Sequence, residues 1–265
     1  MSVPSASAPL LPKPPRHPYS RPLLTVCLGP IRSTLSLDLR TSWSTNDVNP
    51  KQSSLDQKPL RYSEPFFSDP ESRHMYKWGG RAWDAENDTV ADLWAFEADG
   101  RGGGTWGIKQ LGNQDVFKGF MAVANAASVN TPDGAFIFGG HDWKDLQGPN
   151  LKGWYKFNFT TAEWSLDTEA GYSKKYGTIF GATATYVDGF GSAGLIFILG
   201  GIPSRDTPDG QYMPWETVWF YDIGAGRWHT QETSGYGDDN SRPDRRRHHC
   251  AVGVRGSGED STFEM

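Results

Sequence analysis

The amino-acid sequence predicts an all-β protein built from a repeated four-stranded sheet, and three observations lead to this prediction. Short apolar strands end in a double glycine three times, 60 and 61 residues apart, at Gly79-Gly80, Gly139-Gly140 and Gly200-Gly201. An aromatic segment and then a lone tryptophan follow each pair. Helix-period apolar runs are absent, whereas 31 glycines and 18 prolines suit short strands joined by turns. A period shared by glycine, aromatic and tryptophan positions indicates a repeat architecture.

Each repeat is expected to hold four strands. The first is small and apolar, the second ends in the double glycine, the third carries the aromatic segment and the fourth carries the tryptophan. The aromatic residues and tryptophans form three pairs, which are Phe96 with Trp106, Phe157 with Trp164, and Tyr221 with Trp228. The first pair lies ten residues apart and the others seven, because a Gly-rich insertion at 99–104 lengthens the first repeat.

A four-stranded sheet of this kind cannot bury both of its faces alone, but copies stacked around an axis can, which is the β-propeller arrangement. We predict three full blades, at about 61–110, 119–167 and 179–231, and a partial fourth at 246–265. The fourth blade stops before its own double glycine. Two open faces of several hundred Å² would forfeit roughly 10 kcal/mol each. We therefore expect an incomplete propeller, a fragment or truncated gene product that is poorly soluble alone.

The N-terminal segment differs from the rest. Residues 1–33 are rich in proline and lack periodicity, which predicts a disordered tail. Leu35, Leu37 and Leu39 then alternate with polar residues, and Trp43 follows, which predicts a half-buried strand over 34–43. No apolar run suggests a membrane span, and the prolines interrupt any signal-peptide core. The localisation is left open.

Charge and cysteine content exclude several classes of function. The net charge of −5 and a pI near 5.7 argue against a general nucleic-acid or anionic-membrane surface. The two cysteines, Cys27 and Cys250, form neither a disulfide framework nor a metal cluster. We therefore expect no metal, no cofactor and no catalytic residues.

Three segments resemble chemical motifs. The Gly-rich stretch 99–104 lies between two predicted strands rather than before a helix, so we interpret it as a hairpin insertion and not as a phosphate loop. The run 245–249 is either a basic patch or the entry to an inner strand, and we favour the second. His141, Asp142 and Asp145 offer a metal site, with a solvated loop as the favoured interpretation.

Two triplets match the glycosylation acceptor pattern, at Asn87 and Asn158. The first is predicted in a loop and the second at a turn, so both are expected to be exposed. Their use depends on entry into the secretory pathway.

The chain resembles kelch-repeat proteins over residues 34–265, most clearly at 76–106, 135–164 and 195–228. In particular it is similar to long-repeat kelch proteins of fungi. That resemblance implies that segment 34–43 completes the last blade and closes the ring, and that complete relatives are at the cell surface or secreted. Glu97 and Asn158 depart from the pattern, because they stand where the third repeat has Asp222.

The resemblance implies a non-enzymatic scaffold whose loops bind a protein partner. Two alternatives remain. A galactose-oxidase-like copper enzyme would need a tyrosine-cysteine pair at the metal, whereas Cys27 lies outside the repeats and Cys250 has no evident tyrosine partner. Carbohydrate binding is suggested by eleven tryptophans, most of which occupy blade positions.

Overall fold

The computed structural model describes residues 33–38, 42, 44, 46, 48–54, 61–72, 74–82, 92–142, 150–204, 212–235, 242–255 and 263–264. Within these residues the protein is almost entirely β. The two helices described are single turns, α1 (Gln114–Phe117) and α2 (Ser173–Tyr176). None of the described helices is long and apolar enough to cross a membrane. The predicted all-β class is confirmed.

Three four-stranded antiparallel sheets form the body of the protein, each in the order of its strands along the chain. Blade 1 contains β4 (Phe66–Ser68), β5 (His74–Lys77), β7 (Trp94–Ala98) and β8 (Gly104–Ile108). Blade 2 contains β10 (Ala127–Thr131), β11 (Gly134–Phe138), β13 (Trp154–Asn158) and β14 (Glu163–Asp167). Blade 3 contains β16 (Thr183–Val187), β17 (Leu195–Leu199), β19 (Thr217–Asp222) and β20 (Arg227–Glu232).

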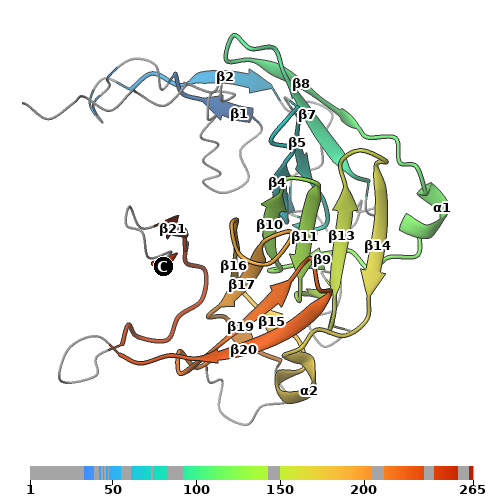
Figure 1. Ribbon diagram of the computed structural model, residues 1–265. Coiled ribbons are helices and arrows are strands. Elements are labelled where there is room, and N and C mark those ends of the chain that lie inside the picture. The colour runs from blue at the N-terminus through green and yellow to red at the C-terminus, as the bar shows by residue number, and fades with distance from the viewer. Residues whose placement is uncertain are drawn as a thin grey trace, which may run out of the picture.

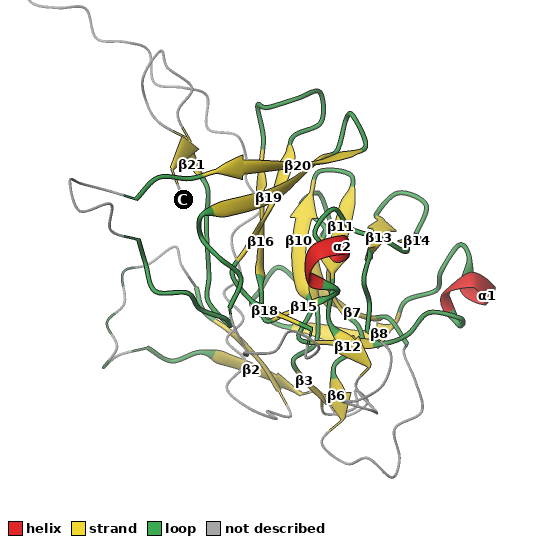
Figure 2. Cartoon of the chain, turned by 90° about the horizontal axis from the view of Figure 1, so that it is seen from below, coloured by secondary structure: helices red, strands yellow, loops and turns green. Residues whose placement is uncertain are grey.

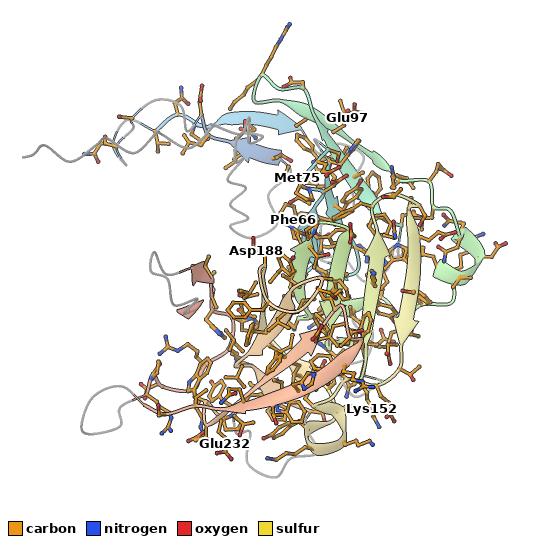
Figure 3. The ribbon with its side chains drawn as sticks, in the orientation of Figure 1. Phe66, Met75, Glu97, Lys152, Asp188 and Glu232 are labelled. Atoms are coloured by element: carbon orange, nitrogen blue, oxygen red, sulfur yellow. The ribbon has the colours of Figure 1, made fainter. Side chains whose placement is uncertain are left out.

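The sheets follow one another in an open arc (Figure 1). Glu97 of blade 1 and Glu232 of blade 3 lie toward the two ends of this arc (Figure 3). A two-stranded sheet of β21 (Val254–Arg255) and β22 (Phe263–Glu264) begins a fourth blade on the open side. The predicted incomplete propeller, with three full blades and a partial fourth, is confirmed.

The sequence period corresponds to a structural period. In each blade the paired aromatic residue and tryptophan lie directly opposite one another on the third and fourth strands. Their ring centroids are 5.3, 5.0 and 5.3 Å apart in blades 1, 2 and 3. Residues 99–103 lengthen the β7–β8 hairpin of blade 1 without changing this register.

Aromatic side chains fill the space between successive blades. Trp164 of blade 2 packs against Trp78 of blade 1, with ring centroids 4.9 Å apart, and against Phe117 of α1 at 5.5 Å. Trp228 of blade 3 packs in the same way against Phe138 at 5.7 Å and Tyr172 at 5.5 Å. Each tryptophan therefore anchors its blade to the preceding one.

The face of blade 1 that carries Trp106, here called its first face, has no complete blade packed against it among the described residues. Trp106 is half-buried there, and its indole Nε1 donates a 2.8 Å hydrogen bond to Thr34 Oγ1. Phe66 and Ile108 lie in register with Trp94 on the same face and are 37% and 50% exposed. This face of blade 1 is therefore only partly covered.

The partial cover comes from β1 (Ser33–Ser36) and β2 (Lys51–Ser54), which pair with each other. Ser33 thus belongs to a strand, whereas the rest of the tail predicted over 1–33 lies outside the described residues, as does Trp43. Of the segment 34–43 the structure describes residues 34–38 and 42, and β1 pairs with β2. Closure of the ring by this segment stays a prediction.

The outer edge of blade 2 is protected by a side chain. Asn113 Nδ2 donates to the carbonyl of Trp164 at 2.7 Å, and its Oδ1 accepts from the Trp164 N–H at 3.0 Å. The amide thus satisfies both groups, as a further strand would.

We expect Asn113→Ala to lower the free energy of unfolding by about 1–3 kcal/mol, because a buried N–H and C=O lose their partners. Urea unfolding measures the loss. Gln114→Ala is the control, since no hydrogen bond of that side chain is seen in the described part of the chain. An equal loss in both variants would contradict the role given to Asn113.

Candidate functional site

The double glycines lie at one end of the blades, here called the glycine end, and they connect each blade to the next. Gly140 N donates to Ile179 O at 2.9 Å, and Gly80 and Gly201 donate to Val123 O and Arg246 O at the same distance. Both glycines of every pair have positive φ, between 60° and 90°. A Cβ on Gly139 would lie 2.5 Å from Ile179 O. Only glycine combines this backbone conformation with so close an approach.

A second series of main-chain hydrogen bonds runs along the same end. Asn125 N donates to Ser63 O at 3.1 Å, Gly181 N to Asn125 O at 2.8 Å, and His248 N to Gly181 O at 2.8 Å. All four residues have positive φ, from 51° to 62°. Each blade therefore contributes one left-handed residue to a continuous hydrogen-bonded chain. No sequence pattern predicts this series, because serine, asparagine, glycine and histidine at these points share no obvious signature.

The basic run 245–249 takes part in both series. Arg246 supplies the carbonyl for Gly201, and His248 donates to Gly181, so the backbone of this run begins the fourth blade. Arg245 forms an ion pair with Glu216 at 3.1 Å, and both side chains are largely exposed. The described contacts favour the interpretation as the entry to an inner strand.

Small two-stranded sheets extend the glycine end, one for each full blade (Figure 2). They pair β3 (Arg61–Tyr62) with β6 (Arg81–Ala82), β9 (Val123–Ala124) with β12 (His141–Asp142), and β15 (Ile179–Phe180) with β18 (Ile202–Pro203). In each, the residues before the first strand pair with those after the double glycine. The chain leaves β6, β12 and β18 and enters β7, β13 and β19 at this end, so the long connections between second and third strands start and return here. Residues 83–91, 143–149 and 205–211 of these connections lie outside the described residues.

His141 is not solvated, which corrects the interpretation made from sequence. It is 7% exposed, because β12 places it in a sheet with its Nδ1 3.1 Å from Ala124 O and its ring 5.2 Å from that of Phe180. Asp145 lies outside the described residues. No group of three potential metal ligands occurs in the part of the chain that the structure describes.

At the opposite end of the blades, polar side chains cap the third-to-fourth-strand hairpins. Asp99 Oδ1 accepts from Arg101 N at 2.7 Å and Gly103 N at 2.8 Å. Asn158 Oδ1 accepts from Thr160 N at 2.8 Å, and Asp222 Oδ1 accepts from Ala225 N at 2.9 Å. Asp99, and not Glu97, is therefore the counterpart of Asp222 in blade 1.

The hydrogen bonds from Arg101 and Gly103 hold the pKa of Asp99 below its ordinary value of 3.8. The lowered pKa means that this carboxylate stabilises the turn above pH 4 and that the contribution is lost as the pH falls through the folded-state pKa.

We expect the Arg101 and Gly103 amide shifts to titrate with a midpoint below 3.8 when NMR spectra are recorded from pH 6 to pH 2. Asp99→Asn should keep the turn, as Asn158 does in blade 2, and lose the titration. An identical titration in the variant would contradict the assignment.

The remaining predicted positions are placed as follows. Asn158 is the last residue of β13, next to the β13–β14 turn, and is half-buried, whereas Asn87 lies outside the described residues. Glycosylation at either position stays a prediction. Cys250 is an exposed free thiol, and Cys27 lies outside the described residues.

Comparisons with known proteins bear on the fold. No protein-family profile matches the chain, and no curated protein matches it in sequence. A solved structure described as "Structure of YjhT" is similar, with a TM-score of 0.53 and 14% sequence identity over 76% of this chain. The match spans 59% of that structure's chain, less than two thirds of its length. Together with the stacked four-stranded blades, this similarity defines an incomplete β-propeller.

Proposed function

We propose that this chain is part of a non-enzymatic kelch-type β-propeller that binds another protein through the connections at its glycine end. One observation carries the proposal. The three long connections between second and third strands all start and return at that end, whereas the opposite end carries short hairpin turns such as 132–133 and 159–162. Binding surfaces are commonly built from loops held on a rigid scaffold.

The rigidity of the scaffold supports the same proposal. Two main-chain hydrogen bonds join each pair of successive blades at the glycine end, one from the second glycine and one in the left-handed series. The connections therefore leave from fixed positions, which lowers the ordering cost of binding. Kelch identity, including similarity to the fungal long-repeat proteins, is proposed on the period of double glycines and aromatic-tryptophan pairs.

Site-specific photo-crosslinking tests the proposal. A photoreactive residue at Tyr62 or Asp142, both at the glycine end, should yield discrete protein adducts in the native host that excess unlabelled protein competes away. Positions Asp133 and Asp188, in turns at the opposite end, are the matched controls. Equal adducts at both ends, or none at the glycine end, would rule out this surface.

The non-enzymatic part of the proposal has its own test. Elemental analysis of purified protein after exposure to copper should find no stoichiometric metal, and sugar alcohols should produce no hydrogen peroxide. One copper per chain together with peroxide formation would replace the scaffold proposal by the oxidase alternative.

A further inference from the structure

The fourth blade is joined to blade 3 through a short segment, residues 246–251. Its main chain makes two hydrogen bonds with blade 3, from Gly201 N to Arg246 O and from His248 N to Gly181 O. Thr183 Oγ1 donates to His249 O, and Thr185 Oγ1 donates to Ala251 O at 2.9 Å. His249 lies in the middle of these contacts, so its ionisation bears directly on whether the joint holds.

The repeat places a different residue at this position in blades 2 and 3. The residue that follows the left-handed one is Ala126 in blade 2 and Ala182 in blade 3, but His249 in blade 4. An imidazole thus stands where blades 2 and 3 put a methyl group, whereas blade 1 has Glu64 at this position.

The imidazole of His249 lies against apolar and main-chain atoms, and the residue as a whole is half-buried. Its ring lies edge-on to Trp215, with centroids 5.8 Å apart, and a Cβ on Gly200 would be 2.6 Å from its Cε1. Both ring nitrogens are buried and lack a hydrogen-bond partner among the described residues. A neutral ring fits this environment, whereas a charged ring would lose its hydration without a partner.

The charges facing His249 disfavour a second positive charge. On its own segment, Arg246 is the neighbouring cation and His248 the neighbouring imidazole, and burial followed by these two groups lowers the pKa of His249. Burial and Arg247 lower the pKa of His248 as well. From blade 3 the loop residue Glu216 is the nearby carboxylate, and it is exposed and paired with Arg245. Thr183 on β16 and Gly200 after β17 are uncharged. The side chain of Arg242 donates a hydrogen bond to the carbonyl oxygen of Thr233.

We propose that this joint is acid-sensitive, so that protonation of His249 releases segment 242–255 from blade 3 while blades 1 to 3 stay folded. The docked state holds the neutral ring, and the released state protonates near pH 6.5. Docking is therefore complete above that pH and weakens as the pH falls toward the folded-state pKa, by up to about tenfold per pH unit. The inference concerns the fold of the fourth blade and is independent of the proposed protein binding.

Hydrogen exchange measured by mass spectrometry on the full chain tests the proposal. Between pH 7.5 and pH 5.5, after correction for intrinsic exchange rates, protection of peptides from 242–255 should fall by up to about tenfold. Protection of peptides from β10 to β14 should stay unchanged. His249→Gln and His249→Ala should each remove the pH dependence, the second by restoring the residue found in blades 2 and 3.

His248→Asn is the matched control, because asparagine accepts a left-handed backbone and leaves the neighbouring imidazole in place. This variant should retain the fall in protection. The proposal is overturned if segment 242–255 is unprotected at both pH values, if all blades lose protection together, or if the His249 variants keep the wild-type pH dependence.

Discussion

Replacing Trp164 with alanine is expected to lower the free energy of unfolding by about 3–5 kcal/mol, the range typical of large aromatic deletions in cores. Trp164 is 2% exposed and packs between blades 1 and 2. Its ring lies 4.9 Å from that of Trp78 and 5.5 Å from that of Phe117. The variant removes the central contact of that interface and leaves a cavity that two rigid sheets cannot close. Chemical denaturation followed by circular dichroism measures the effect.

Trp106→Ala is the matched control, because Trp106 occupies the same position in blade 1. Its ring is half-buried on a face that, among the described residues, β1 and β2 cover. The loss of unfolding free energy should be less than half of that for Trp164, because folding buries less of the apolar surface of Trp106. Equal losses would show that the first face of blade 1 is as fully packed as the interface between blades.

Replacing Gly139 with alanine is expected to destabilise the protein by about 3 kcal/mol or more. A left-handed conformation costs a non-glycine residue about 1–2 kcal/mol, and φ is +64° here. The new Cβ would also lie 2.5 Å from Ile179 O. To relieve that clash, blades 2 and 3 must move apart and weaken the Gly140 N to Ile179 O hydrogen bond, which contributes about 1 kcal/mol.

Gly107→Ala supplies the control for this glycine. Gly107 lies in β8, its φ is not in the left-handed region, and a Cβ there would meet nothing within 4 Å. Alanine should be neutral or stabilise the protein by about 0.4–1 kcal/mol, because it restricts the unfolded chain. In thermal unfolding, the Gly139 variant should melt several degrees below the wild-type protein, and the Gly107 variant at or above it. A loss at Gly107 as large as at Gly139 would contradict the explanation from contacts.

The aromatic-tryptophan pairs show which part of the fold can be predicted from sequence. In every blade an aromatic residue on the third strand faces the tryptophan on the fourth strand, as Phe157 faces Trp164 in blade 2. Each blade therefore repeats the same residue types at nearly the same spacing. The double glycines are predictable for the same reason, because each blade needs the same close approach at the same point. Local requirements that recur in every repeat leave a visible period.

Contacts made once follow no such rule. Asn113 pairs with the edge of β14 across 51 residues of sequence, and nothing in its neighbours indicates a capping role. His141 looked solvated because it follows a double glycine, yet β12 and Phe180 bury it. Both outcomes depend on where a distant segment comes to lie, which the local sequence does not determine.

The sequence by itself determined the blade, its four strands and the residues that stack one blade on the next, because those requirements are local and repeated. The tertiary structure decided how the blades are joined. The left-handed residues Ser63, Asn125, Gly181 and His248 differ in type and are linked only by main-chain hydrogen bonds between blades. A backbone donor and acceptor are present in every residue, so their pairing leaves no mark in the sequence and appears only when the chain is folded.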